Sequence, residues 1–153
     1  AGGVAAFLSG LKKYADAKGL HKGAYILAEA ETKVGRSTTP KLIIIATGSE
    51  VGLAMEAREQ LNAAGTPTRV VSMPCWEFFD AQTQKYRDEV LPPKITARLA
   101  IEAGVSQGWH KYVGTSGDVL AVDKFGTSAP AEDVFRDYGF TIENVVAKAN
   151  KLI

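Results

Sequence analysis

Four carboxylates stand at or just after the ends of predicted strands, and they are the side chains best placed to do chemistry. They are Glu50, Glu77, Glu102 and Asp123. In an open parallel sheet the carboxyl ends of the strands share one edge, and ligands bind there, near the point where the strand order reverses. We therefore expect the four acids to gather at this edge. They would line either a crevice for a polar or cationic ligand or a surface for a partner.

The first of these acids belongs to a helix-start motif. Thr47-Gly48-Ser49-Glu50 has the pattern of a capping box, in which the Thr47 hydroxyl accepts the Glu50 amide and the Glu50 carboxylate reaches back to the Thr47 amide. We interpret this motif as structural. The Gly48 and Ser49 amides could instead bind an anion at the start of the helix, but the negative charge of Glu50 would repel a phosphate there. The glycine motifs of dinucleotide and nucleoside triphosphate sites do not occur in the sequence.

Nucleophilic and metal chemistry find little support. Cys75 and His110 could form a nucleophile and its base, but one cysteine after a strand and near aromatic residues is typical of a packed thiol. We interpret His110, beside Trp109 and Tyr112, as a surface or interface histidine. A single cysteine excludes an internal disulfide, and His21 and His110 are too far apart in the sequence to indicate a metal site. We therefore assign no catalytic, cofactor-binding or metal-binding residue.

Two tryptophans are expected beside the acids. Trp76 and Trp109 each follow a predicted strand, so both should lie at the same edge of the sheet, with Arg58 nearby. Rings beside acids suit a contact with another domain or a second subunit, because aromatic residues anchor interfaces and charges set their register. The alternative is that both rings cover helices of this domain. The candidate crevice or interface comprises Thr47, Gly48, Ser49, Glu50, Trp76, Glu102, Trp109, His110 and Asp123.

Strands and helices alternate along the chain. Continuous apolar runs predict strands that are covered on both faces, as in a parallel sheet between layers of helices. The predicted strands are 25–30, 42–46, 69–73, 97–103 and 119–123, and the predicted helices are 4–18, 49–64, 76–90, 130–138 and a last helix capped by Thr141. This alternation predicts a doubly wound α/β sandwich.

Length and composition predict one soluble domain. The 153 residues are 46% hydrophobic and 23% charged, as in globular proteins. Lys and Arg number 18 and Asp and Glu 17, so the net charge of +1 gives no basis for nucleic-acid or anionic-membrane partners. No apolar run reaches the roughly 20 residues of a membrane-spanning helix, and the N-terminus does not resemble a signal peptide. One cysteine suits a reducing, cytoplasmic compartment.

Several stretches in a fixed order resemble the C-terminal domain of transketolase. They are ATGSEV (46–51), VVSMP and WE within 70–80, VLP (90–92), TAR and IEAG within 96–104, KYVG (111–114), FG and SAPAE within 125–132, and YGFT (138–141). KGAYIL (22–27) is similar to the start of this domain in the family. The resemblance covers about residues 22–153. Residues 1–21 are expected to be a linker, the tail of a preceding domain or an added segment.

The resemblance implies a three-layer α/β/α sandwich whose five-stranded sheet has four parallel strands and one antiparallel strand, with 25–30 among the five. It implies a parent enzyme that uses thiamine diphosphate and a divalent metal, Mg or Ca. Such an enzyme transfers a two-carbon ketol unit from a ketose phosphate to an aldose phosphate in the pentose phosphate pathway.

The resemblance also implies what this chain does not do. In that family the cofactor and the catalytic residues belong to other domains, so this chain would be non-catalytic and would support those domains and a homodimer. The alternative is a stand-alone domain that binds a small molecule or a regulatory ligand at the carboxyl edge.

Overall fold

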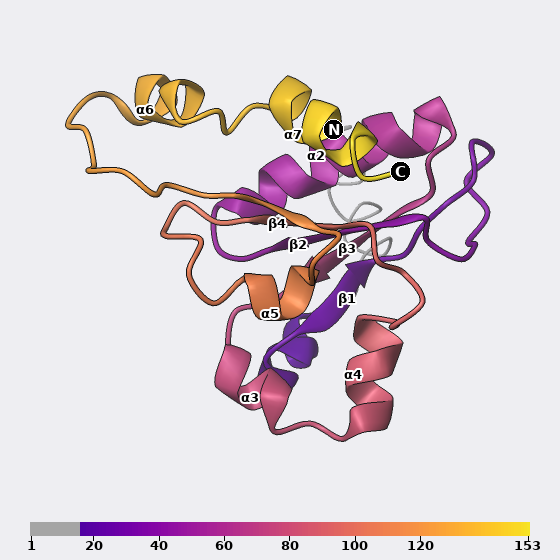
Figure 1. Cartoon of the computed structure of the whole chain (residues 1–153). Helices are drawn as coiled ribbons and strands as arrows, with labels where there is room; N and C mark the ends of the chain where they lie inside the picture. Colours follow the sequence, from indigo (N-terminus) through magenta and orange to yellow (C-terminus); the bar gives the residue numbers. More distant parts are fainter. Residues whose placement is uncertain (1–15) are drawn as a thin grey trace, which may run out of the picture.

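A five-stranded mixed sheet forms the centre of the protein (Figure 1). The structure is a computed structural model and describes residues 16–153. The strands are β1 (Tyr25–Ala28), β2 (Leu42–Ala46), β3 (Thr68–Ser72), β4 (Arg98–Ile101) and β5 (Asp118–Leu120), in the order β1-β3-β2-β4-β5. β1 runs antiparallel to β3, and the other neighbouring pairs are parallel. The predicted mostly parallel sheet with one antiparallel strand is confirmed.

The central strand β2 shows why apolar runs predict this sheet. All five of its residues are buried. Successive side chains of a strand point to opposite faces, so Leu42 and Ile44 pack in one layer while Ile43 and Ile45 pack in the other. A strand that is covered on both faces has no polar face, and its sequence is therefore a continuous apolar run.

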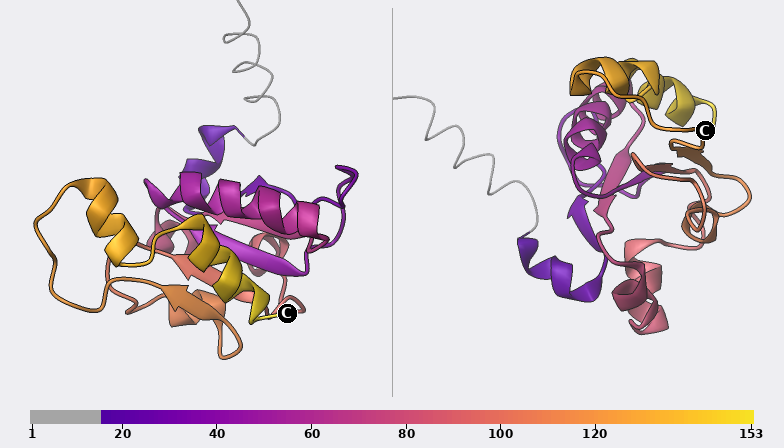
Figure 2. Two further views of the ribbon diagram at one scale, coloured as in Figure 1. Left: turned by 90° about the horizontal axis from the view of Figure 1, so that it is seen from above. Right: turned by 90° about the vertical axis from the view of Figure 1, so that its left-hand side faces the viewer.

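Helices cover both faces of the sheet and produce three layers (Figures 1 and 2). One face carries α2 (Glu50–Ala64), α6 (Ala131–Asp137) and α7 (Ile142–Asn150). The other carries α3 (Trp76–Asp80), α4 (Gln84–Val90) and α5 (His110–Val113), and the 3-10 helix η1 (Ala17–Lys22) lies against β1 and α3. Between residues 16 and 153, none of the helices has the length and apolar character needed to cross a bilayer.

The helix predictions need two corrections. The segment 76–90, expected as one helix, forms α3 and α4, because the Thr83 side chain caps a new helix by accepting the Tyr86 amide at 3.3 Å. The sequence also gave no sign of the one-turn helix α5. The helix expected over 4–18 lies almost wholly outside the described residues. Within the described residues, the first helix is η1, which begins at Ala17.

The predicted capping box at the start of α2 is wrong. The helix begins at Glu50, and the backbone of Ser49, the N-cap residue, is already helical. The Ser49 hydroxyl donates to Glu50 Oε1 at 2.7 Å, so the carboxylate is engaged by its neighbour and not by the Thr47 amide. Thr47 contributes its carbonyl oxygen, which accepts the Glu50 amide at 3.3 Å. The Thr47 side chain is therefore left to face the sheet edge.

Arg58 lies at the opposite end of the sheet from the acids, so its expected place beside them is wrong. The side chain is 2% exposed, donates to the Glu29 carbonyl and pairs with Glu31 at 3.2 Å. Arg69 on β3 pairs with the Glu29 carboxylate at 3.0 Å. Because β1 is antiparallel, the segment after it lies at the amino ends of the other strands. The two arginines fasten that segment to the body of the fold.

Candidate functional site

The order of the parallel strands reverses between β2 and β4. From β2 the chain passes through α2 to β3 on one side, and it then crosses to β4 on the other side of β2. Loops diverge at such a point and leave a crevice at the carboxyl edge. Here the hollow measures 190 Å³, and we call it the carboxyl-edge crevice. Its lining is Thr47, Met73, Pro74, Cys75, Trp76, Glu77, Glu102 and Trp109.

The two tryptophans form one wall of the crevice. Their rings meet edge to face with centroids 5.1 Å apart, and Trp76 also lies 5.7 Å from the Tyr112 ring. Gly108 has a φ of +90°, and a Cβ at this position would lie 2.6 Å from the Trp76 ring, so the loop passes close over the indole. Trp109 is 2% exposed, whereas Trp76 is half-buried. Trp109 therefore packs within this domain, and of the two rings only Trp76 leaves surface for a partner to cover.

Two of the acids interact at the point of strand reversal. Burial raises the pKa of Glu102, and the negative charge of Glu50 raises it further. Glu50 itself is 4% exposed and has its neighbour Ser49 as a hydrogen-bond donor. The two carboxyl groups therefore lie close enough for the charge on Glu50 to disfavour ionisation of Glu102.

The other two acids have separate tasks. Glu77 also lines the carboxyl-edge crevice, and its Oε2 accepts a hydrogen bond from the Cys75 thiol at 3.4 Å. Asp123 is exposed and accepts the Ser106 amide at 2.8 Å, and this hydrogen bond lowers the pKa of Asp123. Asp123 thus joins the loop after β5 to the loop after β4 and does not line the crevice.

The remaining predicted residues lie at the rim. Gly48 and Ser49 are exposed at the start of α2, and His110 is exposed as the first residue of α5. The structure thus brings Thr47, Trp76, Glu102 and Trp109 together in one hollow and leaves Gly48, Ser49, His110 and Asp123 around it.

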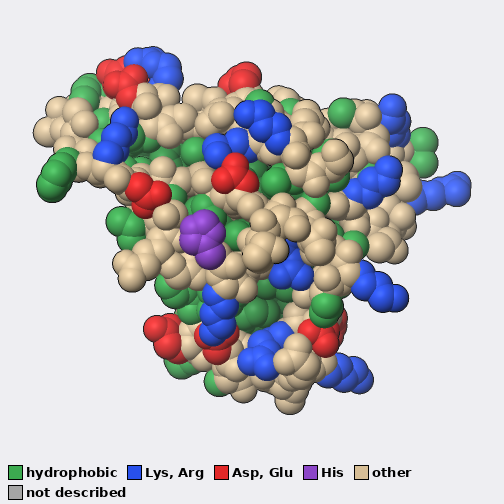
Figure 3. All heavy atoms as spheres, in the orientation of Figure 1, with side chains coloured by type: hydrophobic (Ala, Val, Ile, Leu, Met, Phe, Trp, Pro, Cys, Tyr) green, Lys and Arg blue, Asp and Glu red, His purple; other side chains and the backbone are tan. Residues whose placement is uncertain are grey.

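Exposed apolar side chains extend the site along the sheet edge, and the sequence analysis missed them. Val105 is 59% exposed and Phe125 is fully exposed. A hollow of 500 Å³ joins Val105 to Trp76, and another of 540 Å³ joins Val105 to Phe125 and Asp123. Green hydrophobic atoms reach the surface on the left-hand side of Figure 3, where these loops lie. Large apolar residues in loops that follow strands were the signal available in the sequence.

The carboxyl-edge crevice does not fit a diphosphate cofactor with its metal. A diphosphate is held by cations or free backbone amides, whereas the lining of this crevice carries two carboxylates and no lysine or arginine. A divalent cation needs several converging ligands. Residues 16–153 contain no group of three or more His, Cys, Asp or Glu side chains arranged to hold one.

Comparisons with known proteins agree on one family. The model of the transketolase-like TK C-terminal domain matches residues 23–141. A transketolase from Geobacillus stearothermophilus is 51% identical over 136 residues, which are 89% of this chain and 20% of that protein.

Solved structures give the same result. A transketolase from Leishmania mexicana superposes with a TM-score of 0.77 at 37% identity, covering 90% of this chain and 19% of that one. A Pichia stipitis transketolase in complex with sedoheptulose-7-phosphate superposes with a TM-score of 0.76 at 32% identity. The match covers 92% of this chain and 19% of that one. The chain thus spans about a fifth of the length of these relatives.

Proposed function

Because this chain belongs to the family of transketolase-like C-terminal domains, we propose that it is the non-catalytic C-terminal domain of a thiamine-diphosphate-dependent ketol transferase. The observation that carries the proposal is the 51% identity to a transketolase over 89% of this chain but only 20% of that protein. The parent enzyme would use a divalent metal with the cofactor and act on sugar phosphates in the cytoplasm. Residues 22–153 would form the domain, and residues 1–21 would lead into it.

In this proposal the carboxyl edge works as a docking surface and not as a reaction centre. The half-buried Trp76 and the exposed Val105 and Phe125 offer apolar anchors, and Glu77 and Glu102 set the charge of the surface. Interfaces have this composition, with aromatic anchors inside a polar rim. The partner would be another domain of the same enzyme or the second subunit of a homodimer.

The length of the natural gene product tests the first part of the proposal. Mass spectrometry of the protein isolated from its source should find a polypeptide several times longer than 153 residues. A natural product of this length alone would contradict the assignment and would favour a stand-alone binding domain.

The fluorescence of Trp76 tests the docking surface. In this chain Trp109→Phe leaves Trp76 as the only tryptophan, and in the full-length enzyme the tryptophans of the other domains are replaced by phenylalanine as well. The emission of Trp76 should be red-shifted in this chain and blue-shifted in the full-length enzyme, where a partner covers the ring. Trp76→Phe is the matched control, because the buried Trp109 should emit at short wavelength in both. If the Trp76 emission is the same in both proteins, this edge is not an interface.

A further inference from the structure

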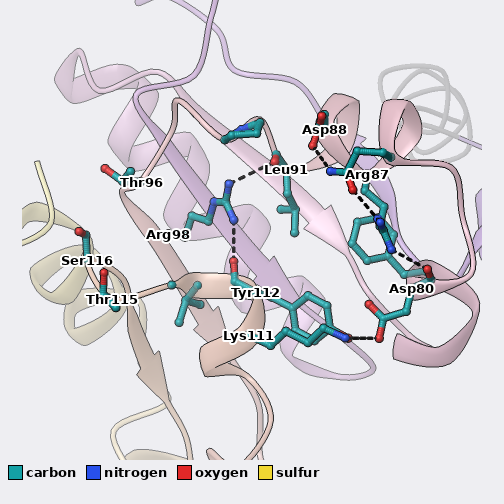
Figure 4. A pocket seen from close by; sticks show the side chains of 15 residues that line it. Asp80, Arg87, Asp88, Leu91, Thr96, Arg98, Lys111, Tyr112, Thr115 and Ser116 are labelled. Carbon is teal, nitrogen blue, oxygen red and sulfur yellow. Dashed lines mark hydrogen bonds and ion pairs between the residues drawn. The ribbon is translucent and has the colours of Figure 1, made fainter.

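A further hollow, of 560 Å³, lies at the opposite edge of the sheet, between α4, β4 and α5 (Figure 4). We call it the amino-edge pocket, because Arg98 stands at the start of β4 and Thr115 and Ser116 lie in the loop that leads into β5. It shares no lining residue with the carboxyl-edge crevice. Its lining also differs in charge from that of the carboxyl-edge crevice, because it includes three cationic side chains from three different elements. They are Arg87 on α4, Arg98 on β4 and Lys111 on α5.

Arg98 is fixed in place by the backbone. Its guanidinium donates to the carbonyls of Ile95, Leu91, Pro92 and Tyr112 at 2.8 to 3.1 Å. These carbonyls occupy four of the five N–H donors of an arginine, so the side chain is already ordered before any ligand arrives. Within residues 16–153 no carboxylate pairs with Arg98, and burial lowers its pKa. Its charge is therefore offset by carbonyl dipoles alone.

Arg87 brings a second guanidinium without an acid. It donates to the Asp80 carbonyl and to Gln84 Oε1, each at 2.7 Å, and among the described residues it forms no ion pair. The two acids of the pocket bind other residues of its lining, so that Asp80 neutralises Lys111 and neither acid pairs with an arginine. Asp80 pairs with Lys111 at 2.5 Å, and Asp88 accepts Gln84 Nε2 at 2.6 Å. Two positive charges thus face the pocket without a carboxylate on either of them.

The opposite wall offers hydroxyl groups. Thr96, Thr115 and Ser116 are exposed to the pocket (Figure 4). Arg87 uses two of its five N–H donors and has three left for phosphate or carboxylate oxygens, whereas Arg98 has one N–H left and contributes mainly its positive charge. Hydroxyl groups complete the binding of such oxygens. We propose that the amino-edge pocket binds a small organic anion through a phosphate or carboxylate group, with Arg87 and Arg98 as its charged ligands. This binding is independent of ketol transfer and of the docking surface.

Calorimetric titration of the 153-residue chain tests the proposal, with inorganic phosphate and citrate as the two probes. At least one should bind saturably, with a Kd in roughly the millimolar range expected for a small ligand with few contacts. Saturation by phosphate alone identifies the phosphate group as the ligand chemistry, and saturation by citrate alone identifies the carboxylate. The absence of saturable binding of both probes overturns the proposal.

Variants locate the binding. Arg87→Gln keeps the Arg98 clamp intact and should raise the Kd about tenfold, as loss of one charge-assisted hydrogen bond does. Ser116→Asp places a negative charge in the exposed wall and should abolish binding without touching the core. Arg136→Gln, which removes an exposed arginine on α6, is the matched control and should leave the Kd unchanged. If Arg136→Gln weakens binding as much as Arg87→Gln, the anion binds the surface non-specifically and the assigned pocket is wrong.

Discussion

At the scale of single residues, Arg58 is a charge that the fold buries and then compensates. Its side chain is 2% exposed, and its partners are the Glu29 carbonyl and the Glu31 carboxylate. Truncating one member of a buried pair leaves the other group without compensation. We expect Arg58→Ala to lower the free energy of unfolding by about 3 kcal/mol, as measured by urea denaturation.

An exposed arginine provides the control for this experiment. Arg136 pairs with Asp133 on the surface of α6, where both side chains are about half exposed. Such pairs contribute little, so Arg136→Ala should change the free energy of unfolding by less than about 1 kcal/mol. Similar losses in the two variants would show that Arg58 does not fasten the segment after β1.

Glu102 gives the stability a pH dependence of definite sign. Burial and the charge of Glu50 raise its pKa above the ordinary 4.5, so the folded state holds this proton more tightly than the unfolded chain. The contribution of this group to the free energy of unfolding is therefore greatest below the pKa that Glu102 has in the unfolded chain. It is lost as the pH rises through the higher pKa that Glu102 has in the folded protein.

Replacing Glu102 by glutamine should remove this loss. Glu102→Gln is expected to be more stable than the wild type at about pH 7, and the gain should disappear at about pH 3.5, where both forms of the protein are neutral at this position. Urea midpoints at the two pH values measure the difference. A variant that is destabilised at neutral pH would mean that the ionised Glu102 carboxylate makes a favourable contact.

At the scale of helices, two threonines with similar sequence contexts behave differently. Thr141 caps α7, where its hydroxyl oxygen accepts the Asn144 amide at 3.3 Å, as the sequence predicts. Thr47 makes no such bond, because Ser49 occupies the N-cap of α2. We expect Thr141→Ala to cost about 1 kcal/mol of stability in urea denaturation and Thr47→Ala less than about 0.5 kcal/mol. A larger loss for Thr47→Ala than for Thr141→Ala would show that the Thr47 hydroxyl does cap α2.

The sequence predicts the central elements well because their signal is local. The run from Leu42 to Ala46 has no polar face, and this is the pattern of a strand between two layers of helices. The break between α3 and α4 was missed because the aromatic and apolar residues of 76–90 continue across it, and only the cap at Thr83 marks the new start. The one-turn helix α5 is too short to show a helical period.

The site was predictable only as far as topology determines it. The rule for parallel sheets placed Trp76, Glu102 and Trp109 at one edge, and the structure brings them into one hollow. The burial of Trp109 depends on its packing with α5 and Tyr112, which no local pattern specifies. The clamp on Arg98 likewise depends on carbonyls from α5 and from the loop before β4, so it is visible only in three dimensions.

At the scale of the whole molecule, the linings of the hollows at the two edges of the sheet have net charges of opposite sign. The carboxyl edge carries Glu50, Glu77 and Glu102 beside apolar loops, and the amino edge carries the arginine-lined pocket. The lining of the carboxyl-edge crevice has no lysine or arginine to hold a diphosphate, and residues 16–153 contain no group of His, Cys, Asp or Glu side chains arranged to hold a metal ion. The central claim, made as a proposal above, is that this chain contributes binding surfaces and no reacting groups to ketol transfer.

An activity assay tests that claim most directly. The purified 153-residue chain, produced in a host that lacks transketolase, is supplied with thiamine diphosphate, Mg²⁺, a ketose phosphate donor and an aldose phosphate acceptor. A full-length transketolase such as the Geobacillus stearothermophilus relative serves as the positive control under the same conditions. We predict that the chain transfers no two-carbon units above the rate of the enzyme-free mixture. Turnover that scales with the concentration of the chain would contradict the account.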